Sequence, residues 1–185
     1  QNLFVIFIIM QPIIDMITSI LVRHVSETFT LGIIIRALFM VIVAIYALII
    51  SDKKYRIGSL IYYVILGIYM LAFVFVMYKE NSTNMIFTQI KGVVKAFYLP
   101  VILISLYPIF KKHKIHLSDD VFIYTLLGYT GIMLIARIFN IAYPTYSIGL
   151  NIGTVGLFYA ANEIGVIICI LSGFLANKLM KEENK

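Results

Sequence analysis

The chain has 185 residues, of which 62% are hydrophobic and 13% are charged, and its mean hydropathy is +0.99. Soluble domains are about half apolar and about a quarter charged, so this composition excludes a soluble domain. The formal net charge is +6. In a chain this apolar, lysines and arginines set the orientation in a membrane, so the charge does not indicate nucleic-acid binding.

Six apolar stretches are each long enough, at roughly 20 residues, to cross a hydrocarbon core of about 30 Å. They predict an all-α polytopic membrane protein. We interpret residues 1–185 as a single transmembrane helical bundle. Because the chain begins with Gln1 and not with Met, we expect it to be part of a longer protein. In chain order, the predicted spans cover residues 3–22, 31–50, 57–78, 86–109, 121–142 and 162–179.

The first predicted span carries Gln11, Pro12 and Asp15 in its apolar sequence. Gln11 and Asp15 are four residues apart, so they lie on the same face of a helix. Pro12 removes a backbone donor and thereby permits a kink. The fourth span is the most interrupted of the six, since two lysines and two prolines fall within it.

The connections between the spans differ in their positive charge. Those after the second and fourth spans, and the tail after the sixth, each carry three lysines or arginines, whereas two of the intervening connections carry one each. The positive-inside rule therefore predicts that both ends of the chain are cytoplasmic. The residues of the basic connections are Lys53, Lys54, Arg56, Lys111, Lys112, Lys114, Lys178, Lys181 and Lys185.

The connection near residues 143–161 is unlike the others. It contains Pro144 and three glycines, which oppose a regular helix, yet it is apolar. That combination favours an interfacial or re-entrant segment packed on protein. A plain outer loop with aromatic side chains at the interface remains the alternative.

Charged side chains inside the predicted spans, with the polar amides beside them, are the candidates for function. Each charged side chain costs about 2.5–3.5 kcal/mol on insertion scales and is usually retained for a purpose. With the predicted orientation, all of them fall toward the extracytoplasmic face. The candidate substrate-binding residues are Arg36, Arg137, Asn162, Lys91, Lys95, Asp15 and Gln11, and the candidate catalytic residue is Glu163.

This set is basic overall, so it suits an anionic ligand whose tail stays in lipid. A pyrophosphate group fits, because arginine binds phosphate in a fork and a helix N-terminus adds N–H donors. Asn162 is placed to cap the last helix, and Glu163 to act as a general base. Structural readings stay open: Lys91 and Lys95 snorkelling to the interface, an ion pair of Arg36 with Asp15, and Glu163 complementing the helix dipole.

The sequence predicts neither a metal site nor a cofactor. His113 and His116 lie in a basic connection without cysteine partners, and a structural zinc site needs four ligands. Cys169 is the only cysteine, which excludes an internal disulfide.

Three segments together resemble a known family. They are Gln11–Ser19 (QPIIDMITS), Leu31–Arg36 (LGIIIR) and Phe158–Gly165 (FYAANEIG). They look like the N-terminal half of the O-antigen ligase and polymerase-like membrane proteins, in the form found in Gram-positive bacteria. The resemblance implies a bundle of about a dozen helices. It also implies a glycosyltransferase of the bacterial plasma membrane that acts in cell-surface polysaccharide biosynthesis, without metal or nucleotide.

The expected partners are a polyprenyl-(pyro)phosphate-linked glycan at the outer face and the surrounding membrane lipids. Within the resemblance, Arg36, Arg137, Asn162 and Glu163 would line the donor site. The long catalytic outer loop of the family is not in this sequence, so the segment alone is not expected to catalyse transfer. Two other functions remain open: a transporter or flippase of lipid-linked oligosaccharide, and a non-enzymatic membrane scaffold. A flippase needs access from both faces, and the apolar inner halves of the spans argue against that.

Overall fold

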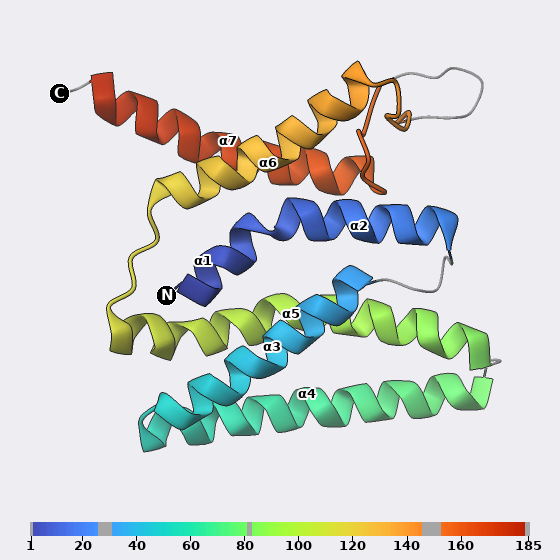
Figure 1. Ribbon diagram of the computed structural model, residues 1–185. Helices are drawn as coiled ribbons and strands as arrows, with labels where there is room; N and C mark the ends of the chain where they lie inside the picture. The colour runs from blue at the N-terminus through green and yellow to red at the C-terminus, as the bar shows by residue number, and fades with distance from the viewer. Residues whose placement is uncertain (1, 26–30, 81–82, 146–152, 184–185) are drawn as a thin grey trace. The chain divides into compact units, whose positions relative to one another are not determined.

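The computed structural model describes residues 2–25, 31–80, 83–145 and 153–183, which contain seven helices and no extended sheet (Figure 1). Five of the helices are each long and apolar enough to cross a membrane, and α1 with α2 would form a sixth span. The predicted all-α polytopic fold is therefore confirmed. The helices are α1 (Asn2–Ile9), α2 (Gln11–His24), α3 (Leu31–Ile50), α4 (Lys53–Glu80), α5 (Thr83–His113), α6 (Asp119–Ile138) and α7 (Ala161–Glu183).

The chain divides into two compact units, and each is described by itself. The first unit comprises Gln1–Leu31 and Leu117–Lys185, and so holds α1, α2, α6 and α7. The second unit is Gly32–His116, which holds α3, α4 and α5. A single bundle over residues 1–185 stays a prediction.

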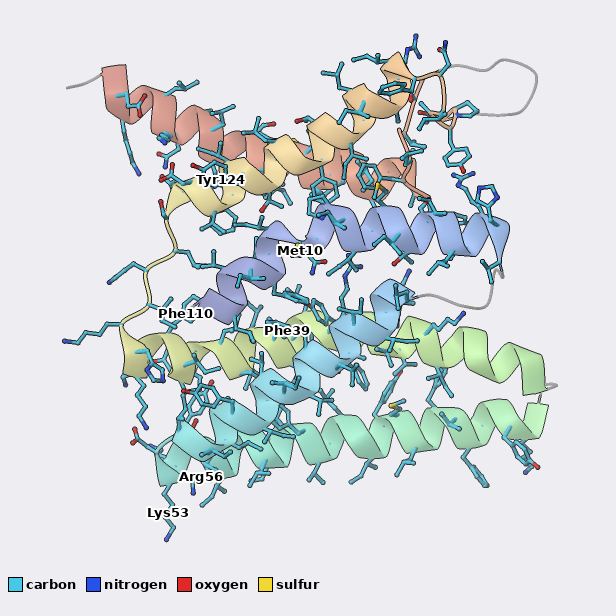
Figure 2. All side chains as sticks on the ribbon, in the orientation of Figure 1. Met10, Phe39, Lys53, Arg56, Phe110 and Tyr124 are labelled. Carbon is cyan, nitrogen blue, oxygen red and sulfur yellow. The ribbon has the colours of Figure 1, made fainter. Side chains whose placement is uncertain are left out.

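The first predicted span is bent by 50° between α1 and α2. The break falls at Met10, which Figure 2 labels, and Pro12 lies in the first turn of α2. The side-chain amide of Gln11 donates to the carbonyl of Phe7 across this break, at 3.3 Å. The kink that Pro12 permits is thus present, and Gln11 bonds the backbone beside it.

The core of the first unit lies along α6, which packs against α7, α1 and α2. Tyr129 is 2% exposed and Phe158 is 1% exposed, and their ring centroids are 5.3 Å apart. Gly128 lets α2 approach closely, because a Cβ atom there would lie 2.9 Å from Cγ of Pro12. A small residue on α6 therefore sets the contact between α6 and the bend.

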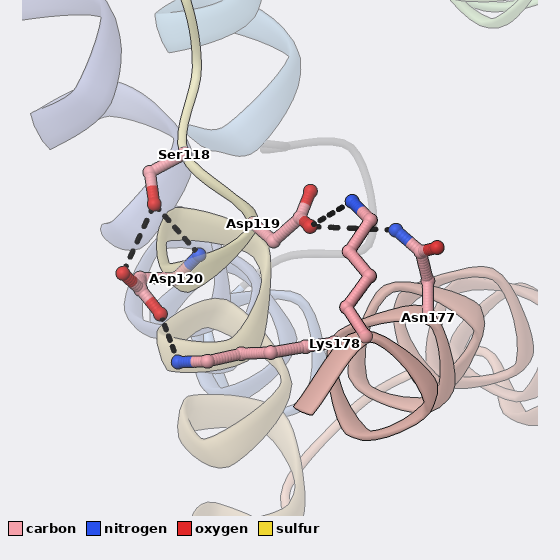
Figure 3. A network of polar contacts seen from close by, with 6 residues as sticks. Ser118, Asp119, Asp120, Asn177 and Lys178 are labelled. Carbon is pink, nitrogen blue, oxygen red and sulfur yellow. Dashed lines mark hydrogen bonds and ion pairs between the residues drawn. The ribbon is translucent and has the colours of Figure 1, made fainter. Parts of the chain in front are cut away.

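The N-terminus of α6 is joined to the C-terminal turns of α7 by a polar network (Figure 3). Ser118 caps α6, since its hydroxyl accepts from the backbone N–H of Asp120 at 3.2 Å. Lys178 donates to the carboxylate of Asp120 at 2.5 Å, and Lys181 pairs with Asp119 at 3.4 Å. Acidic residues in the first turn also favour the helix dipole. At this end of the unit the cations are matched by carboxylates.

In the second unit, a tight turn links α3 to α4. Arg56 closes the turn, because its guanidinium donates to the carbonyls of Ile49 and Ser51 at 3.1 and 3.0 Å. Ile49 lies in the last turn of α3, where carbonyls have no partner inside the helix, and Ser51 follows the helix directly. The last turn of α5 is tied to α3 by the hydroxyl of Tyr46, which lies 2.9 Å from Nε2 of His113.

Helix α5 is continuous through its two internal prolines. Pro108 has no N–H, so it cannot bond the carbonyl of Ile104 four residues earlier. The hydroxyl of Tyr55 on α4 donates to that carbonyl at 2.7 Å. A neighbouring helix therefore replaces the bond that the proline removes, as happens in other membrane helices. Tyr63, about two turns after Tyr55 on α4, and Ser105, which follows Ile104 on α5, add a second α4–α5 hydrogen bond of 2.8 Å.

Candidate functional site

The C-terminal end of α2 carries an arginine that contacts two aromatic rings. The guanidinium carbon of Arg23 lies 3.9 Å from the ring centroid of Tyr143 and 5.3 Å from that of Tyr159. Arg23 also donates to the carbonyl of Phe158 at 3.3 Å. His24 lies 3.1 Å from the hydroxyl of Tyr143. These contacts fasten the connection between α6 and α7 onto the end of α2.

The described parts of that connection, residues 143–145 and 153–160, contact α6 and the end of α2. Tyr143 and Gly156 form an antiparallel bridge, with N···O distances of 2.8 Å for Tyr143 to Gly156 and 3.0 Å for Val155 to Tyr143. Gly156 has φ +63° and lies so close to α6 that a Cβ atom would be 2.8 Å from Cα of Met133. Residues 146–152 lie outside the described residues, so the choice between an interfacial and a re-entrant path stays a prediction.

A cavity of about 380 Å³ lies beside this bridge. Its walls come from the end of α6 and from the connection, and they include Arg137, Asn140, Pro144 and Thr154. Arg137 is exposed, and Asn140 has φ +54°, the left-handed region that asparagine tolerates. The predicted residue Arg137 thus borders a cavity at the end of the unit where Arg23 is held.

Asp15 is bound within the first unit. The hydroxyl of Tyr129 donates to Oδ2 of Asp15 at 2.6 Å, a distance in the range of about 2.5–2.7 Å for hydroxyl–carboxylate bonds. Since Tyr129 is buried, this bond connects α2 to the core of α6. A position for Asp15 on a polar face of its helix was predictable, but Tyr129 as its partner was missed.

The two predicted residues on α7 lie in its first turn. Asn162 and Glu163 are both exposed. The helix begins at Ala161, so Asn162 lies inside the first turn, and the expectation that it caps the helix is wrong. Glu163 is the acidic residue of this turn and complements the helix dipole. Its catalytic role and the substrate-binding role of Asn162 stay predictions.

The remaining predicted cations belong to the second unit. Arg36 is partly buried on α3 and lies within electrostatic range of Tyr98 on α5. Lys91 and Lys95 precede Tyr98 by seven and three residues, so all three share one face of α5. Lys91 is partly buried and Lys95 is exposed. Arg36 therefore lies near Tyr98 on this face of α5, and the substrate-binding roles of the three cations stay predictions.

Arg23 is the residue of this site that sequence reasoning missed. It lies just after the first predicted span, in a short connection with little positive charge. The available signal was the tyrosines of the later connection, Tyr143 and Tyr159, since arginine stacks on aromatic faces. Nothing local in the sequence shows that these two segments meet.

Comparison with known proteins identifies the family. The model of the family described as O-antigen ligase like membrane protein matches residues 1–183. Comparisons with curated proteins and with solved structures found no match. The family match indicates a multi-pass membrane protein with a role in glycan processing. The chain belongs to the O-antigen ligase like membrane protein family.

Proposed function

We propose that this chain is part of a membrane glycosyltransferase that uses glycans carried on polyprenyl (pyro)phosphate at the extracytoplasmic face of the bacterial plasma membrane. The observation that carries the proposal is the family match together with the arginine end of the first unit. There, Arg23 and Arg137 flank one connection from α2 and α6 respectively.

The chemistry of this end suits a pyrophosphate. Arg23 keeps further N–H donors beyond the one it gives to Phe158, because a guanidinium has five. Arg137 borders a cavity of about 380 Å³, which is near the lower limit of ligand pockets. The cavity therefore accepts a phosphate-sized group, and the polyprenyl chain would remain along the apolar helix faces.

The proposed reaction breaks the bond between the sugar anomeric carbon and the pyrophosphate. Negative charge then develops on the leaving pyrophosphate, and preorganised cations stabilise it. In the first unit, Arg137 and Arg23 take this role, and Asn162, Asp15 and Gln11 are the further candidate substrate-binding residues. In the second unit, taken by itself, Arg36, Lys91 and Lys95 are the candidate phosphate-binding residues.

Glu163 is proposed as the base that accepts the proton of the attacking acceptor hydroxyl. Its position in the first turn of α7 follows directly on the connection that Arg23 holds. The acceptor decides whether the step is ligation or polymerisation.

The test is a gene deletion in the host, followed by extraction of polyprenyl-linked intermediates and mass spectrometry with leaflet-selective labelling. The full-length protein is added back as wild type, Arg36→Ala, Arg137→Ala or the control Lys181→Ala, at matched membrane levels. Lys181 lies at the opposite end of α7 and pairs only loosely with Asp119.

Accumulation of lipid-linked glycan on the outer leaflet, rescued by wild type and Lys181→Ala but not by the arginine variants, supports the transferase. Accumulation confined to the inner leaflet indicates a flippase instead. An unchanged pool of lipid-linked glycan would rule out both.

A further inference from the structure

A cavity of about 930 Å³ opens at one end of the second unit, between the first turns of α4 and the last turns of α5. Tyr55, Ser59 and Tyr62 line it from α4, and Ile104 and Lys111 line it from α5. On each helix these residues are three, four or seven apart, so each set occupies one face. The volume is at the upper end of the range of about 300–1,000 Å³ for ligand pockets. Two helix faces thus enclose a space large enough for a small molecule.

The rim of this cavity is positive. Lys54, Lys111 and Lys112 line it, against a single carboxylate from Asp52. Within the described part of the chain, no hydrogen bond or ion pair engages the three lysine side chains. Arg56, from the same turn, differs because its guanidinium is bonded to the end of α3. Arg56 therefore stabilises the turn, whereas the three lysine side chains can bind a ligand.

The N-terminus of α4 adds to this field. The helix begins at Lys53, and the backbone N–H groups of its first turn have no partner inside the helix. Such N–H groups and the helix dipole favour an anion. Figure 2 labels Lys53, whose side chain points away from the helices, so it is not part of the cavity.

Below the rim the cavity becomes apolar. The rings of Tyr55 and Tyr107 stack with centroids 5.5 Å apart, and Ile104 and Pro108 continue the wall. The hydroxyl of Tyr55 is already donated to Ile104. Both helices are candidate membrane spans that end at this rim. The site therefore presents cations at the membrane surface and apolar side chains toward the membrane interior.

We propose that this cavity binds the phosphate head group of an anionic phospholipid, with the acyl chains lying along the apolar faces of α4 and α5. Basic pockets between membrane helices recognise such head groups. A free phosphate would use the lysines but would gain nothing from the apolar wall. The ligand and the residues differ from those of the proposed glycan site, so this inference does not depend on the proposed function.

The test uses the purified full-length protein in detergent and native mass spectrometry during titration with phosphatidylglycerol. Phosphatidylcholine, which has the same phosphate diester without net charge, is titrated in parallel. The site variant is Lys54→Gln with Lys111→Gln. The control is Lys53→Gln with Lys114→Gln, which removes the same charge from the same end of the unit but from outside the cavity.

Wild type and control should bind phosphatidylglycerol alike and in preference to phosphatidylcholine. The site variant should bind phosphatidylglycerol about 10- to 30-fold more weakly, given the attraction of anionic lipid for each basic residue near the surface. An equal loss in both variants would overturn the proposal, because it would show a diffuse surface charge. Displacement of the lipid by millimolar inorganic phosphate would also overturn it, because the site would then be one for small anions.

Photo-crosslinking to wild-type protein keeps the proposal testable if the site variant is unstable. A photoactivatable phosphatidylglycerol should label peptides that contain Tyr55 or Tyr107. Labelling spread evenly over the spans would contradict a defined site.

Discussion

Replacing Tyr55 by phenylalanine tests the inference that α4 supplies the hydrogen bond that Pro108 removes from α5. The variant loses the hydroxyl that donates to the carbonyl of Ile104 at 2.7 Å. Since Pro108 has no N–H, this carbonyl would be left without its helical donor. Interhelical hydrogen bonds in membranes average about 0.6 kcal/mol and reach about 1.7 kcal/mol, and an unsatisfied buried acceptor adds to the cost. We therefore expect the free energy of unfolding to fall by about 1–2 kcal/mol.

The assay is the unfolding of the purified full-length protein by titration with sodium dodecyl sulfate. Tyr62→Phe serves as the control, since Tyr62 lies on the same face of α4. The decisive background is Pro108→Ala, which restores an N–H that can bond to Ile104. In that background Tyr55→Phe should cost less than half as much, as a double-mutant cycle measures. An equal cost in both backgrounds would refute the reasoning.

Two further substitutions test the packing of the first unit. Gly128→Ala places a Cβ atom 2.9 Å from Cγ of Pro12, so overpacking should lower the free energy of unfolding by about 1–3 kcal/mol. Gly131→Ala is the control in the same unfolding assay. A Cβ atom at Gly131 has nothing within 4 Å, so this substitution should be neutral or stabilising. Arg23→Lys keeps the charge but loses the planar stacking on the ring of Tyr143. Amide hydrogen exchange at Tyr143 should therefore accelerate. Unchanged exchange would show that this stacking does not hold the α6–α7 connection in place.

The spans were predictable because length and hydropathy decide them. An apolar stretch of about 20 residues has few alternatives to a spanning helix. The prediction of a spanning helix was correct even for α5, which contains two prolines. A hydrogen bond from a neighbouring helix can replace a backbone bond that a proline removes. The bend before α2 was also predictable, since Pro12 marks it.

The partner of Asp15 was not predictable in the same way. Helical periodicity placed Asp15 on a face of α2, but the identity of the facing residue depends on how α2 and α6 pack. The structure shows the reason for the pairing: Gly128 admits Pro12, and Tyr129 directly after Gly128 then reaches Asp15, one turn after Pro12. A glycine with no chemistry of its own therefore determines a polar contact.

The two ends of the first unit explain why only one of them is a candidate for anion binding. At the end formed by the start of α6, Lys178 is neutralised by Asp120, and Lys181 faces Asp119. At the other end, Arg23 is held by tyrosine rings and a backbone carbonyl. Aromatic faces and carbonyl dipoles stabilise a cation without cancelling its charge. Among the described residues, the end that holds Arg23 therefore retains a positive field that can attract a phosphate. At the other end, Lys178 and Lys181 are paired with carboxylates and join α7 to α6.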